Sequence, residues 1–464
     1  MASDTNSQLP GAEIAVIGGG VAGMAAAFRL QQAGYRVHVY ESNDHVGGRT
    51  HSIYRNGFTL NQGANVMWTA YKSLCGLVHD AGLDGELEAA GSVLGFLWGG
   101  DDMFWLDTDH LLRDAPRFPL SMRSRFTLAR LVFDGYRALR SLRYEDLSAF
   151  ASHDFETAEQ YTRRRLNPEI LERIVAPSVK SMAAAPANVV SNNDLLFMLH
   201  RYSGLGSRWL AFRGGMGSYS RLMSQRFDVT LNAAVTEVEE RDDEVAVTWT
   251  GPHGERTDRY AACIIAVAAH DAATIHVTLD PWRRQFLADV PYAAMSSVQL
   301  ALSKPGPVGI KASYTIHPEW SEIVTAVYEH NKYPGSLPPG KGQLTLYTSD
   351  ALTRQLIDED DQVTVDTVLA EAEKLMPRVR DTIEWAHVKH WREAVFCSRV
   401  GYYKDLAKFN AMRREHDRLV FHAGDYFAPS SMNTASSAGE RAAHDLIAAL
   451  GASTKTGLAA RSAS

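Results

Sequence analysis

Short apolar runs of strand length alternate along the chain with longer stretches of helical periodicity. Near the start, apolar runs at residues 14–17 and 37–40 flank an alanine-rich stretch that predicts a helix. Residues 260–268 form a nearly unbroken apolar run, which is typical of a strand buried on both faces of a sheet. Strands that alternate with helices predict an α/β fold built on a parallel sheet.

Two long regions show a different pattern. Residues 111–210 are mostly helical in periodicity, and Pro168, Pro177 and Pro186 divide them into short helices. Residues 291–384 mix strand-like and helix-like segments. Strands are expected at 298–302, 323–328 and 343–347, and a helix at 363–375. We therefore expect a mixed α+β domain to be inserted into the α/β domain.

Residues 123–143 combine apolar residues at helical spacing with six arginines. A basic amphipathic helix of this kind can lie on a membrane surface. It can also be an ordinary helix whose charged face is solvated, and the acidic residues Glu145, Asp146 and Asp154 follow it closely. We favour the ordinary helix.

The composition is that of a globular protein, with 45% hydrophobic and 22% charged residues in 464. A net charge of −7 gives no reason to expect nucleic acid as a partner. Cys75, Cys263 and Cys397 are too scattered for a disulfide framework or a metal site, so we expect no metal and a cytoplasmic location. No apolar run is long enough to span a membrane. The small, polar residues 451–464 predict a disordered tail.

Glycines in G-x-G-x-x-G spacing follow the first apolar run, at Gly18, Gly20 and Gly23. Gly18 would allow a tight turn, Gly20 the close approach of a pyrophosphate, and Gly23 close packing of a helix on the sheet. The helix start at Val21 and Ala22 would offer N–H groups to the phosphates. This arrangement predicts a dinucleotide site.

Glu41, followed by Ser42, ends the second apolar run. A carboxylate at this place can accept hydrogen bonds from a ribose. Its charge disfavours a 2′-phosphate, which argues against NADP. The motif alone leaves NAD and FAD open.

Three further elements decide between these dinucleotides by resemblance. They are GGRT at 47–50, RGGMG at 213–217 and GERAA at 439–443. In this order they resemble the FAD-dependent amine oxidase and protoporphyrinogen oxidase superfamily. The resemblance implies a three-layer, Rossmann-like FAD-binding domain with a parallel sheet, and an inserted mixed α+β substrate domain.

The resemblance also implies which residues hold FAD. Arg49 is expected to neutralise the diphosphate, Val235 to meet the adenine, and Asp425 to bind the ribityl chain or order the phosphates. The helix start at 432–434 is expected to direct N–H groups at the flavin. The complete set is Gly18, Gly20, Val21, Ala22, Gly23, Glu41, Ser42, Gly48, Arg49, Gly63, Ala64, Val235, Gly424, Asp425, Met432, Asn433 and Thr434.

On the substrate side, Asn65, Trp391 and Tyr403 are expected to orient the substrate at the catalytic centre. The expected substrate-binding residues are Asn65, Met67, Trp68 and Tyr403. Trp391 could equally be a core residue. Tyr402 occupies the place where monoamine oxidases can carry a cysteine bonded to flavin, so FAD is expected to be non-covalent.

The expected function is an FAD-dependent oxidoreductase that moves hydride from a small-molecule substrate to flavin N5. The donor C–H is expected next to an amine nitrogen, with O₂ as the electron acceptor. An enzyme acting on carbon–carbon units, like protoporphyrinogen oxidase or a desaturase, is the alternative. Two departures from monoamine oxidases support this alternative. Residues 295–302 lack their N5 lysine, and Ser431 aligns with their second cage tyrosine.

A third reading is a non-enzymatic escort protein of the same fold, which the complete glycine motif opposes. The oligomeric state stays open between monomer and homodimer. The predicted division is 11–110, 211–290 and 385–450 for FAD binding, 111–210 for a helical insertion, 291–384 for substrate-domain strands, and 451–464 for the tail.

Overall fold

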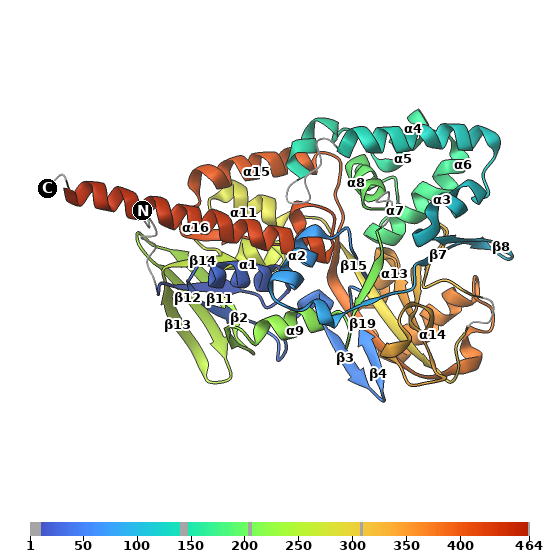
Figure 1. The fold of residues 1–464 in the computed structure, drawn as a ribbon, viewed down its shortest axis with the longest axis horizontal. Coiled ribbons are helices and arrows are strands. Elements are labelled where there is room, and N and C mark those ends of the chain that lie inside the picture. The colour runs from blue at the N-terminus through green and yellow to red at the C-terminus, as the bar shows by residue number, and fades with distance from the viewer. Residues whose placement is uncertain (1–10, 140–146, 203–206, 307–309, 463–464) are drawn as a thin grey trace, which may run out of the picture.

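A five-stranded parallel sheet forms the centre of the α/β part of the molecule. Figure 1 shows the computed structural model, which describes residues 11–139, 147–202, 207–306 and 310–462. The strand order is β10, β2, β1, β14 and β20, and every pairing is parallel. The bounds are β10 (Asp228–Thr230), β2 (Arg36–Tyr40), β1 (Glu13–Ile17), β14 (Ala262–Ile265) and β20 (Val420–His422). The predicted parallel sheet is confirmed.

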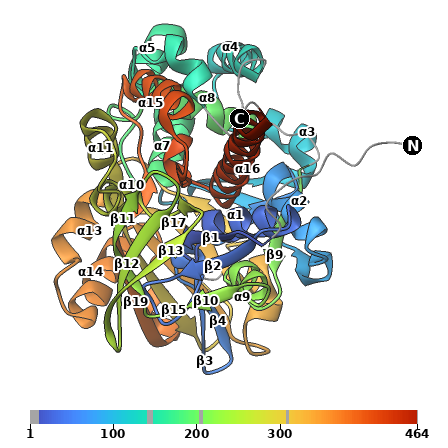
Figure 2. The ribbon, with the colours of Figure 1, turned by 90° about the vertical axis from the view of Figure 1, so that its left-hand side faces the viewer.

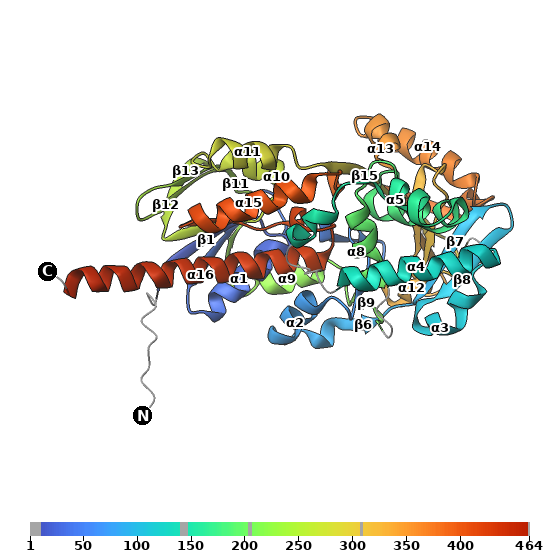
Figure 3. The same ribbon diagram turned by 90° about the horizontal axis from the view of Figure 1, so that it is seen from above.

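Helices cover one face of this sheet. Helix α1 (Val21–Gln32) follows β1 and packs against α16 (Met432–Ser462), which runs beside it in Figure 3. The two helices approach closely, because a Cβ on Gly439 of α16 would lie 2.2 Å from the carbonyl oxygen of Ala22. Further helices in this part are α2 (Lys72–Asp80), α9 (Ser218–Ser224), α10 (Ala269–Ile275), α11 (Pro281–Ala288) and α15 (Tyr402–His416).

An antiparallel three-stranded sheet forms the third layer (Figure 2). Its strands are β11 (Ala234–Glu240), β12 (Val245–Gly251) and β13 (Gly254–Tyr260). The Tyr40 hydroxyl, at the end of β2, donates to Asp258 at 2.7 Å and lies 2.6 Å from the Tyr260 hydroxyl. These contacts join the third layer to the parallel sheet, so the three-layer expectation is confirmed.

A seven-stranded sheet forms the centre of the substrate part. Its order is β19, β15, β18, β17, β16, β7 and β8. All residues of β15 are buried, as in a strand covered on both faces. The bounds are β19 (Ile383–Phe396), β15 (Tyr292–Leu302), β18 (Gly342–Thr348), β17 (Ile323–Tyr328), β16 (Tyr314–Ile316), β7 (Val93–Gly99) and β8 (Asp102–Asp107).

Strands β7 and β8 correct the predicted boundary at residue 111. The sequence placed them in the first FAD-binding segment, yet β7 pairs in parallel with β16 of the seven-stranded sheet. Their alternating pattern predicts strands but contains no information about which of two sheets they join.

Smaller sheets connect the two parts. They are β3 (Ser52–Arg55) with β4 (Phe58–Asn61), and β5 (Met67–Trp68) with β9 (Trp209–Phe212) and β6 (Leu87–Ala89).

Short helices occupy most of residues 111–202, as predicted. Helix α4 lies at the top of the molecule in Figure 1. The bounds are α3 (Leu111–Asp114), α4 (Met122–Leu139), α5 (Ala158–Arg165), α6 (Pro168–Ile170), α7 (Ala176–Ala183) and α8 (Asn192–Tyr202). Helices α12 (Glu329–Lys332), α13 (Asp350–Leu356) and α14 (Asp361–Glu373) accompany the seven-stranded sheet. Residues 140–143 of the arginine-rich segment lie outside the described residues.

The end of the chain differs from its prediction. Helix α16 continues to Ser462, through most of the segment that was expected to be disordered, and it projects beyond the rest of the molecule in Figure 1. Three alanines and a leucine between 452 and 460 have high helix propensity, which the small polar residues do not outweigh. No helix in the described ranges is long and apolar enough to cross a membrane.

Candidate functional site

A cavity of about 840 Å³ lies where the carboxyl ends of β1, β2 and β14 meet the last residues of β19 and the start of α16. Ligands of open α/β sheets bind at such an edge. Its wall combines residues that are hundreds of positions apart in the chain. They include Gly18 and Glu41, the 233–235 segment before and within β11, Trp391 on β19, and Asp425 after β20.

The three motif glycines have different environments. A Cβ on Gly18 would lie 2.7 Å from the carbonyl oxygen of Ala266, and its φ of +105° suits glycine. A Cβ on Gly23 would lie 1.9 Å from the carbonyl oxygen of Gly18. Gly20 has no atom within 4 Å of its Cβ position and lines the cavity. Two glycines therefore serve the packing of the turn, while Gly20 borders open space.

Glu41 is buried at the cavity edge and stabilises the glycine turn. One of its carboxylate oxygens accepts from the Gly19 N–H at 2.8 Å, and the other from the Asn43 N–H at 2.9 Å. Ser42 and Asn43 also line the cavity. Because the N–H groups of Gly18 and Gly19 already have partners, the N–H groups that remain at the turn belong to the start of α1. Val21 and Ala22 line the cavity there.

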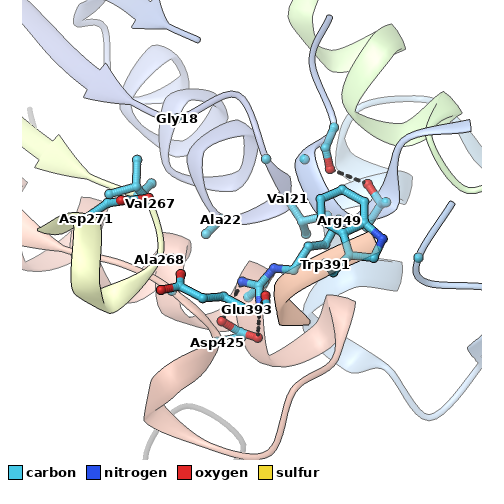
Figure 4. Close-up of a pocket in the computed structure, with 18 of the residues that line it drawn as sticks. Gly18, Val21, Ala22, Arg49, Val267, Ala268, Asp271, Trp391, Glu393 and Asp425 are labelled. Atoms are coloured by element: carbon cyan, nitrogen blue, oxygen red, sulfur yellow. Dashed lines mark hydrogen bonds and ion pairs between the residues drawn. The ribbon is translucent and has the colours of Figure 1, made fainter. Parts of the chain in front are cut away.

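Arg49 and Asp425 form a two-pronged ion pair on the cavity wall (Figure 4). The guanidinium nitrogens lie 2.9 and 2.7 Å from the two carboxylate oxygens. Ser430 donates a further hydrogen bond to Asp425 at 2.6 Å. The pair neutralises Arg49, so the charge expected to act on a diphosphate is already compensated by Asp425.

The start of α16 contributes less to the cavity than expected. Met432 lines it, but Asn433 and Thr434 do not. The Asn433 side chain accepts from the Ser73 N–H at 3.1 Å, and the Thr434 N–H is capped by the Ser431 hydroxyl at 3.0 Å. Helix caps of this kind cannot be distinguished from ligand contacts in sequence, because both use the same groups.

The opposite end of the cavity is lined by apolar and aromatic side chains. Gly63 and Ala64 form its floor, and a Cβ on Gly63 would lie 2.1 Å from the carbonyl oxygen of Arg49. Trp391 lines the wall and donates to the carbonyl oxygen of Gln62 at 2.8 Å. Tyr347 lines it as well and donates to the Gly63 carbonyl oxygen at 2.7 Å.

Burial raises the pKa of the Tyr347 phenol, which stays neutral at physiological pH. Met182 and Met295 complete this end. The sequence did not identify Tyr347 as a site residue. The strand that carries it was predicted, but the facing sheet surface that decides where Tyr347 points was not.

Comparison with known families agrees with this geometry. Residues 21–447 match the family described as flavin containing amine oxidoreductase. The chain belongs to this family. It is therefore an oxidoreductase with a flavin cofactor, and the escort-protein reading is set aside.

Curated members of related families match over short segments. The chain is 41% identical to protoporphyrinogen oxidase 2, chloroplastic/mitochondrial, of Arabidopsis thaliana over 73 residues, 16% of this chain and 14% of the relative. It is 34% identical to 4,4'-diapophytoene desaturase (4,4'-diaponeurosporene-forming) of Staphylococcus aureus (strain Newman) over 102 residues, 21% of this chain and 20% of the relative. These matches span a fifth or less of each relative.

A solved structure shares the architecture of nearly the whole chain. Cyclohexylamine oxidase from Brevibacterium oxydans IH-35A superposes with a TM-score of 0.72 at 20% sequence identity, covering 95% of this chain and 99% of that one. At this identity the likeness establishes the fold of the two proteins.

The cavity of this family member fits a flavin dinucleotide. Gly20 leaves open space beside the start of α1, which an extended ligand with a phosphate can approach. Val235 lies in the wall near Glu41, and Gly48 and Gly424 line the middle. Among the described residues of the wall there is no cysteine or histidine. These residues of the wall therefore offer no thiol or imidazole that could bond to a flavin.

Asn65 lies behind the cavity wall, not in it. Its side-chain amide donates to the Tyr347 hydroxyl at 2.8 Å, and its carbonyl oxygen accepts from Lys332 Nζ at 2.7 Å. Lys332 also contacts the Asn65 side-chain oxygen and pairs with Glu329 at 2.8 Å. Both members of this ion pair are almost fully buried. Asn65 therefore positions Tyr347 instead of contacting a substrate directly.

Three other expected substrate residues are not in the wall. Met67 and Trp68 belong to β5, where they are buried against the hydrophobic core, and Trp68 packs on Trp209. Tyr403 lies in the first turn of α15, fully buried, with its hydroxyl on Asp194. Because a helix begins at Tyr402, the Tyr403 side chain points toward α8 instead of the cavity.

Proposed function

We propose that the cavity binds FAD non-covalently. The proposal is supported by the continuous cavity that joins the Gly18–Glu41 turn to the aromatic end at Trp391 and Tyr347. The adenosine would lie toward Glu41 and Val235, and the flavin ring toward Gly63 and Ala64, where only small residues fit. Acid precipitation of the purified protein tests this proposal. Yellow FAD is expected in the supernatant, and colour retained in the pellet would contradict non-covalent binding.

We further propose that the enzyme removes hydride from a substrate C–H next to an amine nitrogen. Bound FAD would supply the hydride acceptor, flavin N5, and O₂ would reoxidise it to give hydrogen peroxide. The chain's own contribution is placement of the donor carbon. Trp391, Tyr347 and Met295 would form a wall that excludes water and restricts the orientation of the substrate. Amine oxidation by a relative of the same fold supports this choice.

Oxidation of carbon–carbon units is the second candidate. The cavity end is lined by Met182 and Met295 as well as aromatic residues, so an apolar substrate can fit. The two curated relatives, a protoporphyrinogen oxidase and a diapophytoene desaturase, favour this reaction over the segments that match.

A hydrogen peroxide assay separates the two reactions. The FAD-loaded enzyme is offered primary and secondary amines, amino acids, a tetrapyrrole and a polyene at equal concentrations. Peroxide with amines alone supports the first proposal, and turnover of the tetrapyrrole or polyene alone supports the second. Trp391→Phe is expected to lower the turnover, whereas Trp385→Phe on the same strand, outside the cavity wall, serves as the matched control.

A further inference from the structure

Helix α4 exposes large apolar side chains. Met122 is 66% exposed, Phe126 75%, Val132 61% and Phe133 56%. An amphipathic helix in a globular protein normally buries such residues and exposes its charges. The sequence favoured an ordinary helix with a solvated charged face, yet these four apolar side chains are exposed as well.

The exposed apolar residues lie on one face of the helix. Met122, Phe126 and Phe133 are spaced by four and seven residues, which places them on one side of an α-helix. Ser124, Leu131 and Gly135 are spaced by seven and four residues and are buried. The buried stripe points into the helical part of the molecule, so the apolar stripe points directly away from it. Figure 1 shows α4 along the upper edge of the molecule, which agrees with this orientation.

Arginines flank the apolar stripe. Beside the stripe formed by Met122, Phe126 and Phe133, the helix exposes three arginines on one side. They are Arg123, Arg130 and Arg137. Within the described ranges, none of the three forms an ion pair, although Arg137 lies over the Phe133 ring. By contrast, the arginines at 163–165 of α5 all pair with acids. The face is therefore apolar in the middle and positively charged along one side.

We propose that this face of α4 docks on the surface of an anionic lipid membrane. A helix that lies in the membrane interface inserts its apolar side chains and keeps arginines at the level of the phosphates. A second copy of this chain fits the face less well. A two-fold symmetric contact would bring the same unpaired arginines together, and like charges repel. The three arginines instead complement a negative surface, where each contributes roughly fivefold to the affinity.

Co-sedimentation with vesicles tests the proposal on the full-length, FAD-loaded protein. Vesicles of phosphatidylcholine alone are compared with vesicles that also contain phosphatidylglycerol. The wild-type protein is expected to bind the mixed vesicles and to dissociate as the salt concentration rises. Phe126→Glu is expected to weaken binding at least tenfold. Val363→Glu is the matched control, because Val363 is a 45% exposed apolar residue on α14.

The triple variant R123Q/R130Q/R137Q distinguishes the role of charge. It is expected to lose the preference for phosphatidylglycerol while its unfolding midpoint stays at the wild-type value, since all three side chains are exposed. Equal binding by wild type and Phe126→Glu would overturn the proposal. So would a wild-type protein that binds neither kind of vesicle, and so would a wild-type dimer in light scattering that Phe126→Glu converts to monomer.

Discussion

Gly20 and Gly23 provide the sharpest test of how the glycine turn works. Gly20→Ala and Gly23→Ala each add one methyl group, three residues apart in the same motif. At Gly20 the new Cβ meets nothing within 4 Å, and φ is −78°, which alanine adopts readily. At Gly23 the new Cβ would lie 1.9 Å from the Gly18 carbonyl oxygen.

The two substitutions should therefore affect different properties. Gly20→Ala is expected to leave the free energy of unfolding of the flavin-free protein unchanged or raise it by ~0.4–1 kcal/mol, because alanine restricts the unfolded chain. Gly23→Ala must push α1 away from the turn, which costs ~1–3 kcal/mol or more. Gly20→Ala is nevertheless expected to weaken FAD binding at least tenfold, about 1.4 kcal/mol, because the methyl group occupies the space beside the phosphate site.

Urea unfolding of the flavin-free proteins and titration with FAD, followed by flavin fluorescence, measure the two quantities separately. The reasoning is refuted if Gly20→Ala destabilises the flavin-free protein as much as Gly23→Ala does. Wild-type FAD affinity in Gly20→Ala would equally refute it, since the open space beside Gly20 would then not be the phosphate site.

Three further predictions concern Asp194, Lys332 and Trp391. Burial raises the pKa of Asp194 to about 7, so the folded state keeps a proton that the unfolded state loses. The free energy of unfolding should therefore fall as pH rises from 4 to 7, by up to ~1.4 kcal/mol per pH unit, and level off above pH 7. Asp194→Asn should reduce that slope in urea unfolding but not remove it, because burial also raises the pKa of Asp417 to about 7; an unchanged slope would assign all of it to other groups. Lys332→Met should lower the free energy of unfolding by ~3–5 kcal/mol, because it leaves Glu329 buried and unpaired. Adding Glu329→Gln should recover most of this loss in the same assay, and no recovery would rule out the ion pair as the cause. Trp391→Phe should lower kcat about tenfold with little change in FAD affinity, because it loses the hydrogen bond that holds the ring to Gln62. An equal loss of kcat and of FAD affinity would instead place the ring against the cofactor.

The parts of the site formed by residues close together in the chain could be predicted from the sequence. The glycine turn, Glu41 and the strands around them are determined by residues close together in the chain, so spacing alone predicts their arrangement. Arg49 and Gly63 were found through resemblance, and both line the cavity. Their precise partners were not found, because Asp425 reaches Arg49 only after the chain has folded.

The residues at the substrate end of the cavity were harder to predict from the sequence. Asn65 was expected to orient the substrate, but it does not line the cavity, and its contacts depend on Lys332, which comes from a distant short helix. Tyr403 was expected at the cavity, but the first turn of α15 directs its side chain toward Asp194 of α8. Periodicity in α4 likewise predicts an amphipathic helix without showing which stripe is buried, and there the apolar stripe at Phe126 is the exposed one.

Anaerobic reduction of the bound flavin tests the central proposal most directly. The enzyme is mixed without oxygen with amines, amino acids and desaturation substrates, and the flavin absorbance near its visible maximum is followed. We predict rapid bleaching by an amine that has a hydrogen on the carbon next to nitrogen, slowed when that hydrogen is replaced by deuterium. Bleaching by carbon–carbon substrates alone, with no amine active, would contradict the account.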